Sequence, residues 1–289
     1  MCLISLAWGA SADFPLVIAA NRDEFYHRPT APLSAWTSVS GHTIVGGRDL
    51  RDGGTWMGFT PSGRFACLTN VRAPLDEMPA HLRSRGELPV AWLSSHQNAQ
   101  TWASTVNMQD YAGFNLLVGD WHARTCIYIS NREEKTAESK VNSAQAATED
   151  IADKAASPSA MVRNIGWQSI VGLSNAALDT PWPKTQCLKA AMTSSLQAQP
   201  GIAQLQQQLQ AALQDTQPVA LQDLPHTGLT PDREQALSSV FVRYPALAPQ
   251  YGTRTSLVAV LNASGALHLQ ETTHTGEQPG RVASYILDW

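Results

Sequence analysis

The chain has 289 residues, of which 43% are hydrophobic and 15% are charged, and this composition is that of a globular protein rather than a disordered one. Its net charge of −4 and its lack of any Lys/Arg-rich run exclude a general nucleic-acid binder. The four cysteines, at positions 2, 67, 126 and 187, form no Cys-x-x-Cys pair. This spacing argues against a zinc site or a redox dithiol. Four cysteines could form two disulfides, but in a chain of this size reduced cysteines are the simpler expectation.

The first apolar stretch, CLISLAW, predicts a buried N-terminal strand. No basic residue precedes it, and it spans only seven residues, whereas a signal peptide has a positive start and a longer apolar centre. No stretch of the sequence approaches the roughly 18 continuous apolar residues of a membrane span. We therefore expect a cytoplasmic protein without a membrane span.

Four pairs of strand-like segments predict β-hairpins, because each pair is joined by residues that favour turns. The pairs are 3–8 with 16–20, 55–60 with 64–70, 114–120 with 123–131, and 255–262 with 266–273. Hairpins build antiparallel sheets, whereas a dinucleotide-binding fold needs alternating β-α-β units.

Helical spacing of apolar residues predicts helices between these strands, within residues 84–97, 183–197, 201–215 and 232–241. Antiparallel sheets covered by helices give an α+β fold, which we expect to be a single domain over residues 1–289. The polar segment 133–160 is expected to be an insertion that forms a surface loop.

The first hairpin brings reactive side chains together. If Trp8 pairs with Leu16, Cys2 faces Arg22, and opposed residues of an antiparallel pair have Cβ atoms only ~5 Å apart. The polar cluster NRDE, residues 21–24, should then lie beside the first residues of the chain.

Removal of Met1 would make Cys2 the N-terminal residue. A free thiol has a pKa of about 8.5 and an α-amine one of about 8, so the amine can take the thiol proton and later give it to a leaving amine. Arg22 would favour the thiolate, and Asp23 would hold the α-ammonium. The alternative is structural, since cysteine is commonly a small buried hydrophobe and NRDE can close a strand with an ion-paired turn.

The segment GGRDLRDGGTW, residues 46–56, has four glycines and two Arg-Asp pairs. We expect a loop that either closes over a ligand or forms a turn. It does not match the GxxxxGK[ST] pattern of a phosphate-binding loop.

The segments just described, MC, VIAANRDEFYHRPT and GGRDLRDGGTWMGFTPSGRFACLTNVR, resemble the NRDE family, the homologues of transport and Golgi organisation protein two. The resemblance continues in order through SRGELPV, YAGFNLLVGD, IYISNR, GLSNAALDTPWPK, LPHTG, ALSSVFV and YGTRTSLV, and only segment 133–160 is longer than the family usually has. It implies an N-terminal-nucleophile hydrolase fold, a four-layer αββα sandwich of two antiparallel sheets between helical layers. Such hydrolases cut carbon–nitrogen amide bonds.

The resemblance also implies site residues, because the bile-salt and penicillin V acylases similarly begin with Met-Cys and carry Arg and Asp after the second strand. The implied catalytic residues are Cys2, Arg22, Asp23, Asn70, Asn175 and Arg254. Asn70 is implied as an oxyanion donor, Asn175 as the residue that holds the tetrahedral intermediate or the α-amine, and Arg254 as a late-sequence arginine of the site. Structural roles stay open, namely strand-end caps or turns for the asparagines and a surface ion pair for the arginine.

Ligand binding is expected from Asn21, Glu24, His27, Arg48, Asp49 and Trp56, and no metal site is expected. The first functional hypothesis is hydrolysis of an amide or thioester bond of a small acyl substrate through Cys2, without a cofactor. The second, of a different class, is non-enzymatic carriage of haem or acyl-CoA, with which the family is associated. Haem iron takes His or Cys as axial ligand, and His27 is the histidine nearest to the NRDE cluster.

Overall fold

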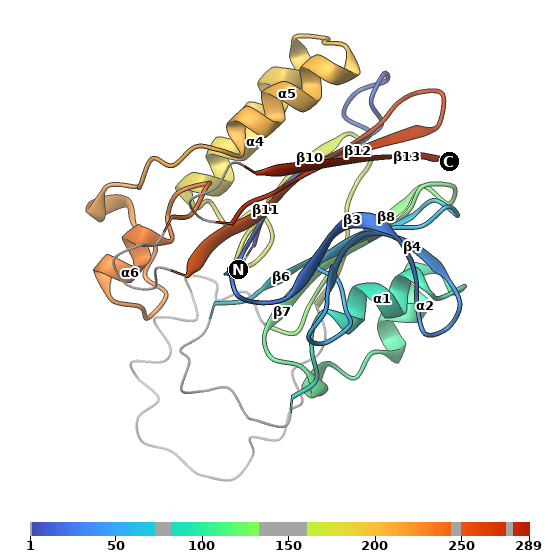
Figure 1. Ribbon diagram of the computed structural model, residues 1–289, viewed down its shortest axis with the longest axis horizontal. Coiled ribbons are helices and arrows are strands. Elements are labelled where there is room, and N and C mark those ends of the chain that lie inside the picture. Colours follow the sequence, from blue (N-terminus) through green and yellow to red (C-terminus); the bar gives the residue numbers. More distant parts are fainter. Residues whose placement is uncertain (1, 73–81, 133–160, 244–249, 276–279) are drawn as a thin grey trace.

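The computed structural model describes residues 2–72, 82–132, 161–243, 250–275 and 280–289, so the predicted insertion 133–160 lies outside the described residues. Two antiparallel sheets lie face to face, and helices cover both outer faces (Figure 1). The predicted α+β class and the four layers are confirmed. Within the described ranges, no helix has the length and apolar character needed to cross a membrane.

The first sheet contains the N-terminal hairpin and the C-terminal strands. Its strand order is β10 (Ser169–Leu173), β1 (Cys2–Trp8), β2 (Leu16–Phe25), β11 (Tyr251–Leu261), β12 (Ala266–Thr273) and β13 (Arg281–Asp288). The pairing of Trp8 with Leu16 and of Cys2 with Arg22 is confirmed. The first and fourth predicted hairpins are therefore present.

Strand β2 does not end at Ala20, as the sequence predicted, but continues through the NRDE cluster to Phe25. The reason is that β2 pairs with β1 on one edge and with β11 on the other, so the backbone of residues 21–25 has hydrogen-bonding partners in the sheet.

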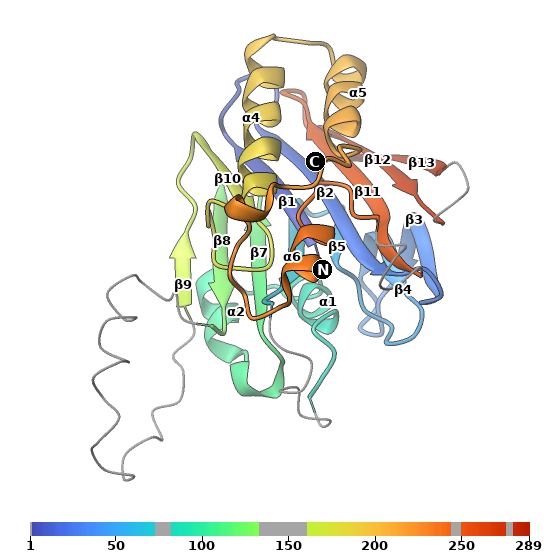
Figure 2. The same ribbon diagram turned by 90° about the vertical axis from the view of Figure 1, so that its left-hand side faces the viewer.

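The second sheet contains the second and third predicted hairpins (Figure 2). Its strand order is β3 (Thr30–Thr37), β4 (Thr43–Asp49), β5 (Met57–Phe59), β6 (Arg64–Asn70), β7 (Phe114–Asp120), β8 (Thr125–Ser130) and β9 (Met161–Asn164). The predicted loop 46–56 is shorter than expected, because Gly46 pairs with Ser34 inside β4. A Cβ at Gly46 would lie 2.5 Å from the Met57 carbonyl oxygen, so this strand contact requires glycine.

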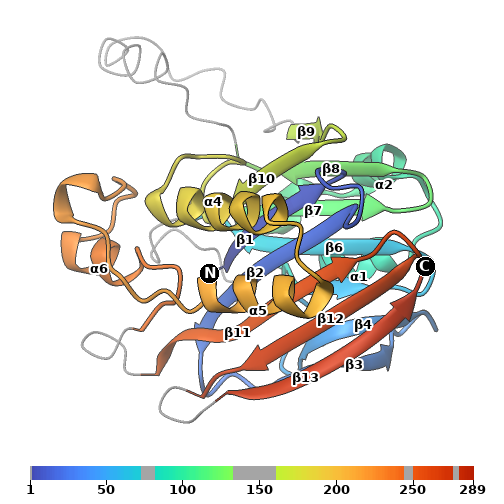
Figure 3. The same ribbon diagram turned by 90° about the horizontal axis from the view of Figure 1, so that it is seen from above.

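Helices α4 (Pro183–Gln197) and α5 (Ile202–Ala212) lie over the first sheet (Figure 3). Helices α1 (Glu87–Leu93) and α2 (Ala99–Thr105) cover the second sheet, and α6 (Pro231–Ala236) lies beyond α5 in the chain. All four predicted helical regions contain a helix. Short 3-10 helices in the described part of the chain include Met108–Asp110 and Leu221–Asp223.

The alternation of side chains along β1 divides the core. Ile4 and Leu6 pack between the two sheets, whereas Leu3 and Ala7 pack beneath α4 and α5. Cys2 shares the face of Ile4 and therefore points into the space between the sheets.

Candidate functional site

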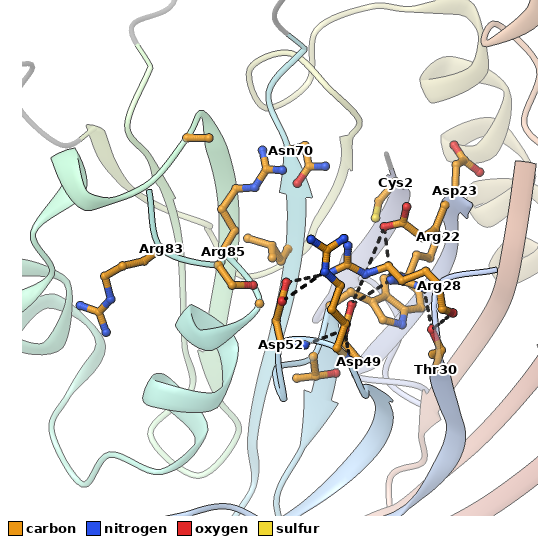
Figure 4. A pocket seen from close by; sticks show the side chains of 18 of the residues that line it. Cys2, Arg22, Asp23, Arg28, Thr30, Asp49, Asp52, Asn70, Arg83 and Arg85 are labelled. Atoms are coloured by element: carbon orange, nitrogen blue, oxygen red, sulfur yellow. Dashed lines mark hydrogen bonds and ion pairs between the residues drawn. The ribbon is translucent and has the colours of Figure 1, made fainter. Parts of the chain in front are cut away.

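A cavity of about 420 Å³ opens where β1 begins (Figure 4). Its lining comes from both sheets and from residues 82–86, which precede α1. The predicted site residues that line it are Cys2, Arg22, Asp23, Glu24, Asp49, Trp56 and Asn70. The fold thus brings together residues that are far apart in the sequence.

Cys2 lies at the start of β1 with only 6% of its surface exposed. The Ser174 hydroxyl donates a hydrogen bond of 3.1 Å to the Cys2 carbonyl oxygen, which fixes the backbone at this position. Burial raises the pKa of the Cys2 thiol to about 11. The thiol is therefore protonated at neutral pH, and its use as a nucleophile requires a base.

Asp23 follows Arg22 on β2, so its side chain leaves the opposite face of the strand, and Figure 4 shows it directed away from Arg22. The Asp23 carboxylate accepts a 2.8 Å hydrogen bond from the Thr253 hydroxyl. Burial raises the pKa of Asp23, and the charge of the buried Lys184 opposes this rise. Asp23 thus borders the cavity from the helical side of the sheet.

Strand β11 contains a β-bulge opposite Arg22 and Asp23. Asp23 is opposite Thr253 and Arg22 is opposite Thr255, so Arg254 is an extra residue in the ladder. The Arg254 guanidinium donates to the Tyr26 carbonyl oxygen, and Arg254 is not among the residues that line the cavity.

A network of ion pairs occupies one wall of the cavity (Figure 4). Arg28 Nε donates to Asp49 at 2.5 Å and its Nη2 to Asp52 at 2.7 Å, while Arg22 Nη2 lies 3.4 Å from both Glu24 and Asp49. Burial alone would raise the pKa of Asp49, but the hydrogen bonds from Arg28 and from the backbone lower it. Carboxylates therefore already compensate the charges of Arg22 and Arg28.

Asn70 ends β6 and lines the cavity, as Cys2 does. The buried Asn175 does not line it; its Nδ2 donates a 2.9 Å hydrogen bond to the Asn70 carbonyl oxygen. In this arrangement Asn175 holds the backbone of Asn70.

Three predicted ligand-binding residues do not line the cavity. The Asn21 amide donates to the carbonyl oxygens of Leu213 and Val240 beneath the helical layer. His27 is exposed, and its ring centroid lies 5.4 Å from that of Phe25. The Arg48 guanidinium lies over the Trp36 ring at 4.7 Å. Their roles in ligand binding stay predictions.

Arg85 lines the cavity but was not among the predicted site residues. Its Nη1 donates to the Gly113 carbonyl oxygen at 3.0 Å, and burial lowers the pKa of its guanidinium. The segment that contains Arg85, SRGELPV, contributed to the helix predicted within residues 84–97 and to the family resemblance, but it gave no site residue. Arg28 and Asp52 were also missed, although both lie in or beside the quoted motifs.

The parts of the chain that the structure describes contain no cluster of three or more His, Cys, Asp or Glu residues suited to a metal ion.

Comparison with known proteins gives relatives along most of the chain. The family model described as Transport and Golgi organisation 2 matches residues 1–276. The Transport and Golgi organization protein 2 homolog of Bos taurus is 29% identical over 281 residues, which cover 93% of this chain and 90% of that protein. The Homo sapiens homolog is 28% identical over 269 residues, covering 89% and 86%. Transport and Golgi organization protein 2 of Drosophila melanogaster is 24% identical over 285 residues, covering 92% and 88%.

The similar solved structures include two of low sequence identity. One is the C2A mutant of the conjugated bile acid hydrolase from Clostridium perfringens, with a TM-score of 0.46 and 8% identity over 100% of this chain and 92% of that one. The other is the N-acylethanolamine-hydrolyzing acid amidase ortholog of Caenorhabditis elegans, with a TM-score of 0.41 and 11% identity over 90% and 92%.

Proposed function

The chain belongs to the Transport and Golgi organisation 2 family, and from the geometry of its cavity we propose that it hydrolyses an amide or thioester bond of a small acyl substrate with the Cys2 thiol as nucleophile. One observation carries this proposal: Cys2, Arg22 and Asn70 line the same cavity of about 420 Å³. A cavity of this size accommodates a small molecule. A thiol, a neighbouring cation and an amide donor are the groups that acyl transfer uses.

In the proposed first step, removal of Met1 has left a free α-amine on Cys2. As Sγ bonds to the substrate carbonyl carbon, the thiol proton passes to this amine and the carbonyl oxygen becomes an oxyanion. The side-chain amide of Asn70 donates a hydrogen bond to the oxyanion. The intermediate then collapses, the C–N or C–S bond breaks, and the leaving nitrogen or sulfur takes the proton from the ammonium.

Water completes the reaction. It attacks the carbonyl carbon of the thioester on Cys2 and gives one proton to the α-amine. The bond from carbon to Sγ breaks, the acyl group leaves as a carboxylic acid, and the proton returns to Sγ. Because burial raises the pKa of the Cys2 thiol to about 11, little thiolate is present at neutral pH. The α-amine, with a pKa of about 8, is therefore proposed as the base that takes the thiol proton during attack.

Asp23 is proposed to hold the α-ammonium during both steps. Its carboxyl borders the cavity on β2, beside the beginning of β1, and Thr253 fixes it at 2.8 Å. Arg22 is proposed to favour negative charge on Sγ, since it faces Cys2 directly in the ladder.

Carriage of haem or acyl-CoA stays a prediction. Among the described residues that line the cavity, Cys2 is the one side chain of a type that binds haem iron, and the apolar residues are few: Trp56, Leu68, Leu82 and Ala112. A ligand that buried a large apolar surface would have little to pack against here. The lining therefore favours the hydrolase hypothesis with a compact, polar substrate.

The test uses the purified full-length protein and its Cys2→Ala variant with short-chain N-acyl amino acids and acyl thioesters of N-acetylcysteamine. We expect an intact mass without Met1, release of the amine or thiol by the unsubstituted protein, an acyl adduct on Cys2 after rapid quenching, and no release by Cys2→Ala. Cys187→Ala is the matched control, because that cysteine is exposed and does not line the cavity. Turnover that persists in Cys2→Ala, or active protein that retains Met1, would overturn the proposal.

A further inference from the structure

The arginines around the cavity differ in how their charge is compensated. Arg22, Arg28, Arg51 and Arg83 each have a carboxylate within 4.0 Å, whereas Arg85 has no such partner among the described residues. The hydrogen bond from Arg85 Nη1 to the Gly113 carbonyl oxygen uses one of five N–H donors.

The side chain of Arg85 is directed into the cavity. In Figure 4 its side chain extends towards Asn70, so both side chains face the space that Cys2 borders. Arg83, two residues earlier, also lines the cavity, but Figure 4 shows its guanidinium directed away from Arg85 and Asn70, and it pairs with Glu87 at 2.6 Å and with Asp110 at 3.6 Å. The half-buried Arg85 therefore offers unused donors to whatever enters the cavity.

A guanidinium that is taken out of water without an anionic partner costs free energy, and a carboxylate or phosphate would remove that cost with two parallel hydrogen bonds. We propose that Arg85 is an anion subsite, so that the substrate carries a carboxylate or phosphate group in addition to the bond that is cleaved. This inference rests on the proposed function for the identity of that bond, but the binding of the anion does not depend on catalysis.

The rival role for Arg85 is to stabilise the oxyanion of the reacting carbonyl together with Asn70. The two roles predict different dependence on substrate charge. An anion subsite discriminates between charged and neutral members of a matched pair, whereas an oxyanion donor assists both members equally.

The test measures binding by calorimetry to protein that carries Cys2→Ala, so that no ligand is consumed. The carboxylate probe is N-hexanoylglycine, with its methyl ester as the neutral partner. The phosphate probe is N-hexanoyl-O-phosphoethanolamine, with N-hexanoylethanolamine as its neutral partner. We expect at least one anionic probe to bind about tenfold or more tightly than its neutral partner, since a hydrogen bond to a charged group contributes this much. The preferred pair identifies the anion as carboxylate or phosphate.

Arg85→Gln should abolish this preference, and Arg85→Lys should keep part of it because it retains the charge without the fork. Arg83→Gln is the matched control and should keep the full preference, because the Glu87 and Asp110 carboxylates already compensate the charge of the Arg83 guanidinium. Melting curves of each variant show whether loss of the Gly113 contact has disturbed the fold. The subsite is overturned if anionic and neutral partners bind equally, if the preference survives Arg85→Gln in folded protein, or if none of the four probes binds saturably. Equal binding of the partners, or a preference that survives Arg85→Gln, would leave the proposed hydrolysis through Cys2 unaffected. Conversely, charge-selective binding by an unsubstituted protein that hydrolyses no substrate would refute the hydrolase proposal and leave the anion subsite standing.

Discussion

Cys2 on β1 and Arg22 on β2 are directly opposed residues of one antiparallel ladder, and both line the same cavity. Their side chains share the face between the two sheets, whereas Asp23 leaves β2 on the helical side. The Cys2 thiol and the Arg22 guanidinium therefore reach the cavity from the face between the sheets. The Asp23 carboxylate lies at the border of the cavity, on the helical face of the first sheet.

The pH dependence of turnover distinguishes two ways of activating Cys2. Burial raises the pKa of the thiol to about 11, so a mechanism that used preformed thiolate would accelerate up to that pH. With the α-amine as base, kcat/KM should instead level off above an apparent pKa of about 8. A pH–rate profile from pH 6 to 10.5 checks this. Cys2→Ser should retain the limb near pH 8 at a lower rate, and a profile that still climbs at pH 10 would exclude the amine as base.

Asn70→Ala should lower kcat by about 10²–10³ with little change in KM, because the oxyanion forms only in the transition state. The measurement is steady-state kinetics on the substrate with the highest turnover. A change confined to KM would show that Asn70 binds the ground state and does not stabilise the oxyanion.

Asn175→Ala should have a different signature, because Asn175 contacts the Asn70 backbone and not the cavity. We expect a loss of about 1–3 kcal/mol in the free energy of unfolding, since the change removes a buried donor from the Asn70 carbonyl oxygen. The effect on kcat should be smaller than that of Asn70→Ala. Urea denaturation and kinetics on the same preparations compare the two, and equal kinetic losses without destabilisation would place Asn175 at the reacting carbonyl.

Glu271 on β12 predicts a pH-dependent stability. It is 1% exposed, its Oε1 accepts a 2.7 Å hydrogen bond from the Leu33 N–H, and burial raises its pKa to about 7 from an ordinary 4.5. The folded state therefore holds a proton that the unfolded state loses between these two values. The stability linked to this proton is complete below pH 4.5 and is lost as the pH rises to 7, a change of about 3 kcal/mol.

Glu271→Gln imitates the protonated form and should remove this dependence. The variant and the unsubstituted protein should have similar free energies of unfolding near pH 4.5, and the variant should be more stable by about 3 kcal/mol at pH 8. Urea titrations at half-unit pH intervals give the difference, in which all other titrating groups cancel. A difference that is constant with pH would show that Glu271 titrates normally.

Arg72 and Glu234 form a buried ion pair at 2.5 Å, with side chains 5% and 4% exposed. Glu234 also accepts a 3.0 Å hydrogen bond from the Thr227 N–H, so it joins α6 to the end of β6. Glu234→Ala leaves a buried guanidinium without this carboxylate and should destabilise the fold by about 3–5 kcal/mol.

Arg83→Gln provides the contrast, because that ion pair is exposed and should leave the unfolding transition nearly unchanged. Thermal and urea unfolding of both variants make the comparison. A Glu234→Ala protein as stable as Arg83→Gln would mean that water reaches the Arg72 side chain.

The hairpin of β1 and β2 could be predicted because local signals specify it. Turn-forming residues separate two apolar runs, and the pairing of Trp8 with Leu16 then places every other pair, down to Cys2 and Arg22. The end of β2 could not be predicted from the same signals, since Asn21 and Asp23 are polar. Their burial depends on partners more than 180 residues away, such as Leu213 and Thr253.

Arg85 shows why the rest of the site escaped prediction. It belongs to a segment that packs with the second sheet, and only the stacking of that sheet on the first brings it to the cavity of Cys2. Sequence spacing carries no information about such a contact. For Arg48 and His27 the reverse holds, because both lie close in sequence to cavity residues but point elsewhere.

The extra residue at Arg254 has an evolutionary consequence. The bulge shifts the alternation of side chains along β11 by one residue. Thr253 is therefore opposite Asp23 and donates a hydrogen bond to its carboxylate, while Thr255 is opposite Arg22. Deleting the codon for this residue would remove the bulge, but the side chains on one side of it would then lie on the opposite face of the sheet. Length at this position should consequently be less free to drift among descendants of this chain than the identity of the side chain that occupies it.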